Sequence, residues 1–130
     1  MQGKSTEDVR CQIRIMVGRG VGMGPGKAAL LRAIQATHSI NAAGKQFGMS
    51  YRRAWLLVEE MNELFATPLV TSRRGGKGGG GAEITPLGLE VLEQYERLVG
   101  KVLGSAEFKT LARLLGGAKG QRAKPKSRRG

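Results

Sequence analysis

The chain has 130 residues, a length at which one compact domain is expected. It carries 22 Lys and Arg residues against 10 Asp and Glu, so its formal net charge is +12. Such a charge attracts polyanions, with nucleic acid first and an anionic membrane surface second. A hydrophobic content of 40% excludes a fully disordered chain.

The sequence also excludes several classes of protein. The only cysteine, Cys11, cannot form an internal disulfide, and no Cys/His spacing indicates zinc, so we expect a reducing cytoplasm and no metal or cofactor. No stretch approaches the roughly 20 apolar residues that span a bilayer, and no apolar region of a signal peptide follows the first ten residues. His38 has no second histidine or carboxylate beside it, which favours a turn residue over a ligand or base. No acid, base and nucleophile converge on one segment, so an enzyme is not expected.

The first part of the chain predicts a strand, a loop and two helices. Residues 9–17 alternate apolar and polar side chains, which is typical of a strand with one buried face that includes Cys11. The glycine-rich residues 18–26 predict a loop. A helix is expected over 25–37, with proline in its first turn, and a shorter one over 39–47, capped by Ser39 and with Phe47 facing inward.

The next helix is expected over 51–65, and its start carries the strongest functional signal. Gly48 is expected to end the preceding helix, and Ser50 to cap this one, so the two helices form a helix-turn-helix. Arginines follow the cap directly. The apolar stripe expected to face the core recurs at spacings of three and four: Ala54, Leu57, Val58, Met61, Leu64 and Phe65.

The remaining segments predict a hairpin, two helices and a tail. Strands are expected over 69–73 and 82–85, joined by a glycine-rich tip. Thr85 and Pro86 predict the start of a helix that runs to Leu103, and Ser105 the start of another that ends at Gly116. Residues 117–130 contain six Lys or Arg and no acid.

Three ordered motifs resemble one known family: GPGKAALLRAI at 24–34, SYRRAWLLVEEMN at 50–62 and GGKGGGGAEITPLG at 75–88. Together they resemble the N-terminal DNA-binding domain of the ModE family of molybdate-responsive regulators, which is related to the LysR-type winged helix. The resemblance covers roughly residues 9–103. It implies a dimer that places the 51–65 helix in the DNA major groove and a glycine-rich wing at the backbone or minor groove. Too few residues follow to form the family's molybdate-binding domains, so we expect a stand-alone form.

The DNA-binding residues expected on the helix are Ser50, Tyr51, Arg52 and Arg53. The amides at a capped helix start favour a phosphate, and the first turn of a recognition helix reaches base edges. An arginine can bind guanine in a bidentate way, although either arginine could instead hold phosphate. The alternative without a function is a charged helix face exposed to solvent. Trp55 is expected to support the helix rather than contact a base.

The DNA-binding residues expected on the wing are Arg73, Arg74, Lys77, Gly78 and Gly79, with the cations holding phosphates. The glycine spacing also matches GxGxxG, but no helix follows it, and a phosphate loop at Gly26-Lys27 lacks its first glycine and its Ser/Thr. Both nucleotide-site hypotheses therefore fail, and an unstructured hairpin is the remaining alternative.

These observations predict an α+β, mostly α fold. It is a winged helix-turn-helix with an N-terminal strand that joins the wing hairpin and a C-terminal dimerisation helix. The expected division is 1–85 as the winged helix-turn-helix, 86–116 as a helical dimerisation region and 117–130 as a basic flexible tail.

The predicted function is sequence-specific binding of double-stranded DNA by a homodimeric, cytoplasmic, nucleoid-associated regulator. It is not an enzyme and needs no membrane. The alternatives are an architectural nucleic-acid binder with little sequence preference and a molybdate-binding protein.

Overall fold

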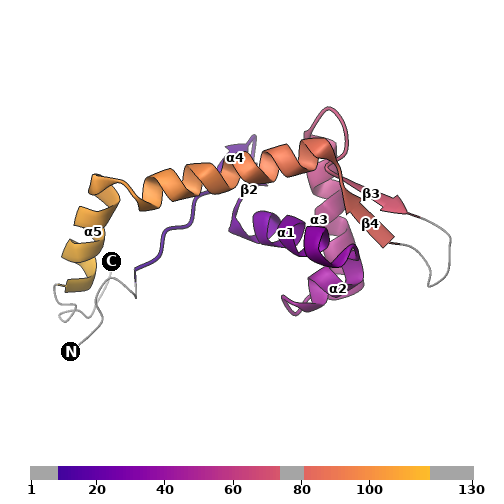
Figure 1. Cartoon of the computed structure of the whole chain (residues 1–130), viewed down its shortest axis with the longest axis horizontal. Helices are drawn as coiled ribbons and strands as arrows, with labels where there is room; N and C mark the ends of the chain where they lie inside the picture. Colours follow the sequence, from indigo (N-terminus) through magenta and orange to yellow (C-terminus); the bar gives the residue numbers. More distant parts are fainter. Residues whose placement is uncertain (1–8, 74–80, 118–130) are drawn as a thin grey trace. The chain divides into compact units, whose positions relative to one another are not determined.

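The computed structural model describes residues 9–73 and 81–117, and contains helices and antiparallel hairpins (Figure 1). Contacts divide it into two compact units. One is Ile13–Arg97, and the other combines residues up to Gln12 with those from Leu98 onward. The predicted fold class, α+β with mostly helix in a winged helix-turn-helix, is confirmed.

Three helices form the centre of the Ile13–Arg97 unit: α1 (Pro25–Thr37), α2 (Ile40–Lys45) and α3 (Tyr51–Leu64). Helix α1 starts with proline, as predicted, and ends where His38 adopts a left-handed conformation with φ 56°. Ser39 then caps α2, because its side chain accepts a hydrogen bond from the amide of Ala42. The fully buried large side chains are apolar and come from the helices and the hairpin that follows them: Leu30, Leu31, Ile34, Met61, Leu69 and Leu92.

Two separate two-stranded sheets accompany these helices. Strand β1 (Ile15–Val17) pairs with β2 (Gly20–Met23), and β3 (Val70–Arg73) pairs with β4 (Gly81–Ile84), each pair antiparallel. Of the predicted strand over 9–17, only Ile15–Val17 forms, and the prediction that it joins the wing hairpin is wrong. The chain turns back at Gly18, where φ is +57°, so that β1 pairs with residues that were predicted to be loop.

The exposure of β1 is a second difference from the prediction. All three of its residues are exposed, and Cys11, expected on a buried strand face, is half-buried and lies outside any strand. Gly22 of β2 explains the close pairing, since an added Cβ would lie 2.6 Å from Cγ2 of Val17. Only glycine lets the two strands approach in this way.

Helix α4 (Pro86–Leu103) starts and ends where the sequence predicts. Within the Ile13–Arg97 unit, three features of its second and third turns attach it to the rest of the domain. Leu92 is fully buried, the Tyr95 hydroxyl donates to the carbonyl of Ile13 at 2.6 Å, and Arg32 of α1 forms a bidentate pair with Glu96. The hydrogen bond to Glu96 raises the pKa of the Arg32 guanidinium above its ordinary value.

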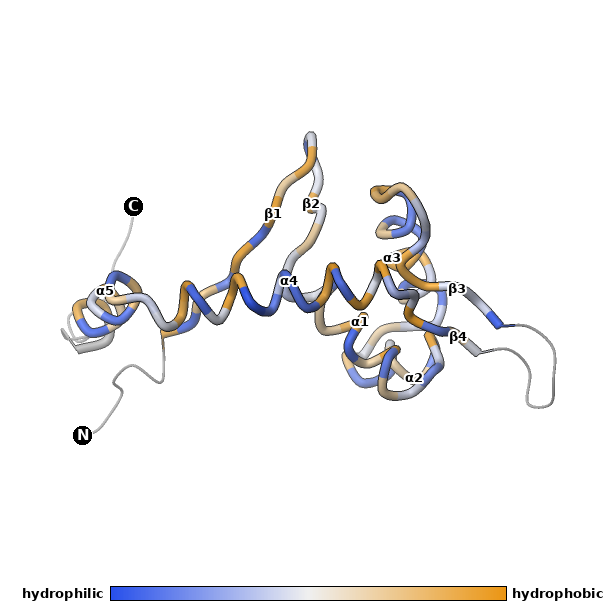
Figure 2. Tube along the Cα trace, turned by 45° about the horizontal axis from the view of Figure 1, so that its top comes forward, coloured by the Kyte–Doolittle hydropathy of each residue, from blue (hydrophilic) through white to orange (hydrophobic). Residues whose placement is uncertain are grey.

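The second unit contains the end of α4 and helix α5 (Ala106–Gly117). Ser105 caps α5 as predicted, with its hydroxyl accepting from the amide of Phe108 at 3.0 Å. Apolar and polar stretches alternate along α5 (Figure 2), and three of its leucines are exposed: Leu111, Leu114 and Leu115, at 56%, 58% and 65%.

Candidate nucleic-acid interface

The helix-turn-helix is built on a close approach of α2 to α3. Gly44 sits in this contact, and an added Cβ would lie 2.7 Å from the Cβ of Ala54. The turn ends at Gly48, where φ is +72°, a conformation that glycine adopts without strain. Helix α2 stops at Lys45, so Phe47, predicted to face inward, belongs to the turn and is 46% exposed.

The start of α3 is an exposed, capped helix N-terminus, as the sequence predicts. The Ser50 hydroxyl accepts a hydrogen bond from the amide of Arg53 at 3.1 Å. Capping leaves the hydroxyl proton free to donate to an anion, and the helix start carries partial positive charge. The side chains of Arg52 and Arg53 are exposed, and they add two full charges to the same place.

An aromatic surface adjoins these arginines. Tyr51 is 53% exposed and Trp55, one turn later, is 39% exposed, so most of the Trp55 surface is covered. On the adjoining side of α3, Ala54, Val58 and Met61 are buried, as predicted. The first two turns of the helix therefore combine a rigid buried face with an exposed face that holds cationic and aromatic groups.

The predicted wing corresponds to the β3–β4 hairpin. Val70 pairs with Ile84, and the pairing continues to Arg73 opposite Gly81. Arg73 is the wing cation for which the structure describes contacts. Arg74, Lys77, Gly78 and Gly79 lie outside the described residues.

Asn62 connects α3 to the wing, a role that its sequence position alone does not reveal. Its Oδ1 accepts from the amides of Leu69 and Val70 at 2.8 and 3.1 Å, and its Nδ2 donates to the carbonyl of Val70 at 3.0 Å. One side chain thus makes three hydrogen bonds to the first residues of the wing. Asn62 is a positioning residue, because these hydrogen bonds fix the position of the wing relative to α3.

Replacing Asn62 with alanine is expected to lower the free energy of unfolding by about 1–3 kcal/mol, because it leaves half-buried backbone groups without partners. Chemical denaturation at constant protein concentration measures this loss. The control is Asn41→Ala on the exposed side of α2, which should change stability by less than about 0.5 kcal/mol. Equal effects of the two substitutions would contradict the role assigned to Asn62.

The wing also meets the start of α4 at one carbonyl. The carbonyl oxygen of Leu69 accepts from the amide of Thr85 at 2.9 Å, and the Thr85 hydroxyl donates to the carbonyl of Pro68 at 2.8 Å. The same hydroxyl accepts from the amide of Gly88 at 3.0 Å, which caps α4. An added Cβ at Gly88 would lie only 2.3 Å from the Leu69 oxygen, so α4 and the wing cross without room for a side chain.

A cluster of polar side chains lies at the base of the wing. Nη2 of Arg73 is 2.8 Å from Oε2 of Glu83, and Nδ1 of His38 is 3.6 Å from Oε1 of the same carboxylate. The carbonyl of His38 also accepts from the amide of Ala82 at 3.0 Å, so the turn after α1 supports β4. His38 is a turn residue, as predicted, but the expectation that no carboxylate lies near it is wrong. Glu83 is distant in sequence and is brought to it by the hairpin.

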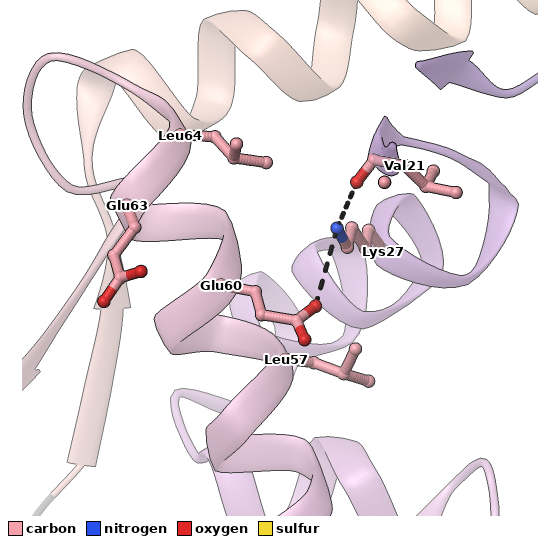
Figure 3. A pocket seen from close by; sticks show the side chains of 7 residues that line it. Val21, Lys27, Leu57, Glu60, Glu63 and Leu64 are labelled. Atoms are coloured by element: carbon pink, nitrogen blue, oxygen red, sulfur yellow. Dashed lines mark hydrogen bonds and ion pairs between the residues drawn. The ribbon is translucent and has the colours of Figure 1, made fainter. Parts of the chain in front are cut away.

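An open hollow of about 580 Å³ lies between the β1–β2 hairpin, α1 and the second half of α3 (Figure 3). The Lys27 ammonium group donates to the carbonyl of Val21 at 2.5 Å and is 3.8 Å from Oε1 of Glu60. Lys27 is therefore engaged within the fold rather than available to a phosphate. Leu64 lines the hollow and is 42% exposed, which corrects its assignment to the core stripe.

No group of three His, Cys, Asp or Glu side chains in residues 9–73 and 81–117 is placed to hold a metal ion. Across the same residues, no helix is both long and apolar enough to cross a bilayer.

Known proteins share sequence with this chain. No family model matches the chain. It is 45% identical over 105 residues to the molybdenum-pterin-binding protein MopB of Rhodobacter capsulatus, a match that covers 78% of this chain and 39% of MopB. It is 43% identical over 74 residues to the transcriptional regulator ModE of Yersinia pestis, covering 57% of this chain and 28% of that protein. The DNA-binding transcriptional dual regulator ModE of Escherichia coli K12 is 40% identical over the same length, with the same coverage.

The chain spans between about a quarter and two fifths of these relatives, so the similarity concerns one part of each of them. Two of the three are named as regulators of transcription, and none carries an enzyme name. Identity at this level confirms the resemblance indicated by the three motifs. Over the shared part, the chain is a homologue of the ModE-type regulators and of MopB.

Proposed function

We propose that the chain binds double-stranded DNA in a sequence-specific manner and acts as a homodimeric regulator of transcription in the bacterial cytoplasm. The observation that carries the proposal is the exposed start of α3. There Ser50 caps the helix, Arg52 and Arg53 follow, and Asn62 ties the same helix to a second cationic element, the wing. In a helix-turn-helix protein this helix start enters the major groove.

The residues divide by chemistry into two groups. Arg52 and Arg53, with Tyr51, would reach base edges, since guanidinium groups can pair with guanine O6 and N7. Ser50 and Arg73 would hold phosphates and set the register of the helix on the duplex, together with Arg74, Lys77 and the glycines 78 and 79 of the wing. The names of the relatives suggest target genes of molybdenum metabolism.

Genome-wide footprinting of the protein on its own chromosome tests the proposal. The expected result is a small set of protected sites that share a two-fold symmetric sequence, with affinity for that sequence at least about 1,000-fold above that for random DNA. Uniform protection without a shared sequence would instead support an architectural DNA-binding protein. Tight stoichiometric binding of molybdate without DNA binding would support the molybdate-binding alternative.

We assign self-association to the region 86–116, which contains most of α4 and α5. The supporting observation is its exposed apolar surface, which a two-fold contact between identical chains would bury. That surface consists of Leu98, Leu103, Leu111, Leu114 and Leu115.

Leu114→Asn is expected to raise the dissociation constant of the dimer at least tenfold, because burying a leucine side chain contributes about 1.5–3 kcal/mol. Analytical ultracentrifugation over a range of concentrations measures this change. Lys109→Asn, at an exposed position on the other side of the same helix, is the control and should leave the constant nearly unchanged. Self-association that survives Leu114→Asn would place the dimer contact elsewhere.

Deleting residues 117–130, with their six cations, should weaken binding to all sequences evenly. Each phosphate contact contributes about 0.9 to the slope of log affinity against log salt, so the slope should become shallower by up to about five per chain. Titrations of operator and scrambled DNA at several salt concentrations measure both quantities. Loss of sequence preference on truncation would show that specificity does not reside in α3.

A further inference from the structure

The base of the wing holds a carboxylate where a DNA-binding surface would be expected to hold only cations. Glu83 lies on β4, opposite Thr71 and two residues beyond Gly81, the partner of Arg73. Its Oε2 is 2.8 Å from Nη2 of Arg73. The wing cation that the structure describes is therefore already paired with an anion of the same chain.

Gly81 lies beside this ion pair. An added Cβ at this position would lie 3.7 Å from Nη2 of Arg73 and 3.1 Å from the carbonyl oxygen of His38. The Arg73 guanidinium thus extends across a strand position that has no side chain, and this brings it to Glu83. The hairpin register places the carboxylate within reach on the neighbouring strand.

All three side chains of this cluster remain accessible to a ligand. Exposed fractions are 52% for Arg73, 42% for Glu83 and 57% for His38. An exposed ion pair of this kind contributes little to stability, because water and salt screen it. A phosphate group can therefore replace Glu83 as the partner of Arg73 without unfolding the hairpin.

We propose that Glu83 is an internal competitor for DNA phosphate, which holds Arg73 until the duplex backbone displaces it. This inference rests on the proposed function, because it assigns a role within the same DNA-binding surface. The carboxylate must give up its partner to the phosphate, so Glu83 lowers affinity for every sequence. It thereby limits non-specific binding by a chain whose net charge is +12.

A purely structural role for Glu83 makes the opposite prediction. If the Arg73–Glu83 pair served mainly to hold the hairpin in shape, removing the carboxylate would disorder the wing and weaken DNA binding. If Glu83 competes with phosphate, removing its charge strengthens binding. The sign of the change therefore separates the two roles.

The test compares Glu83→Gln with wild type in the full chain, with a duplex of scrambled sequence as the probe. Affinity for this duplex should rise by up to about fivefold per chain, which corresponds to the free energy of a well-formed exposed ion pair. Glu90→Gln changes the net charge equally at an exposed position of α4 and serves as control. An increase for Glu83→Gln no larger than for Glu90→Gln, or a decrease, would overturn the proposal.

Salt dependence provides a second readout that a structural role would not produce. In the wild type, salt weakens both the Arg73–phosphate contact and the Arg73–Glu83 pair, and these effects oppose each other. In Glu83→Gln only the effect on the Arg73–phosphate contact remains, so the slope of log affinity against log salt should become steeper. The change should be a fraction of one phosphate contact, at most about 0.9 per chain. An unchanged slope would contradict the competition.

A double-mutant cycle with Arg73→Ala isolates the pair. In the Arg73→Ala background, Glu83→Gln should raise the affinity for DNA no more than Glu90→Gln does, because no arginine remains to be released. A full increase in that background would show that Glu83 acts by general repulsion and not through Arg73.

If the wild type shows no sequence preference, the proposed regulator function fails while this cycle still decides the role of Glu83. If it binds no DNA, both fail.

Discussion

Replacing Arg52 and Arg53 together with alanine is expected to reduce affinity for the operator by at least about 1,000-fold. Each arginine that pairs with a base contributes about 1–3 kcal/mol, and a dimer presents each of them twice. Both side chains are exposed at the start of α3, so their removal leaves the buried face of the helix intact. Fluorescence anisotropy with operator and scrambled duplexes measures the change, and the loss should be much larger on the operator.

The matched control removes the same charge from other exposed sites of the Ile13–Arg97 unit. Arg19 in the turn between β1 and β2 and Arg97 on α4 are both exposed. Replacing this pair with alanine should weaken binding to operator and scrambled DNA alike, through electrostatics alone. If both double variants lost the same affinity on both duplexes, base recognition by α3 would be refuted. The single variants then show which arginine reads a base, because only that one alters sequence preference.

Gly88→Ala is expected to lower the free energy of unfolding by about 3 kcal/mol or more. The new Cβ would stand 2.3 Å from the Leu69 carbonyl oxygen and 2.8 Å from Cγ1 of Ile84. Because backbone occupies the space, the start of α4 must move away from the wing, at an overpacking cost of about 1–3 kcal/mol. That movement also weakens the hydrogen bonds of Thr85, each of which contributes about 1 kcal/mol. The higher helix propensity of alanine offsets only about 1 kcal/mol of this loss.

The same substitution at Gly100, further along α4, should have the opposite sign. No heavy atom lies within 4 Å of the position that its Cβ would take. Gly100→Ala is therefore expected to stabilise the helix by about 0.5–1 kcal/mol. Thermal and chemical denaturation of both variants at one protein concentration provide the comparison. A Gly88→Ala protein as stable as the wild type would mean that α4 and the wing do not cross as closely as described.

Local signals in the sequence were sufficient for most of the helices. Pro25, Ser39, Ser50, Thr85 and Ser105 mark helix starts by chemistry that acts within three residues, and the observed helices begin there. The apolar spacing of α3 likewise identified Ala54, Val58 and Met61 as buried. Such features depend on neighbours in the chain, which a sequence displays directly.

Features that depend on distant residues were missed or misplaced. The alternation over 9–17 indicated a strand, but pairing partners are chosen by turns, and Gly18 directs the chain into a hairpin of its own. The proximity of Glu83 to Arg73 and His38 follows from hairpin register, and the contact of Gly88 with Leu69 follows from the crossing of two elements. Asn62 is polar in the last turn of an amphipathic helix, and that was the one available signal of its role.

The three hydrogen bonds of Asn62 also determine which insertions the fold can tolerate. The amide group has an acceptor on one side and a donor on the other, and it is matched to two N–H groups and one carbonyl of residues 69 and 70. A slip of β3 by one position would offer it the wrong groups and would turn the Arg73 side chain to the opposite face of the hairpin. Related chains should therefore show no insertions or deletions between Asn62 and Val70. One added residue there would break the hydrogen bonds that join α3 to the wing.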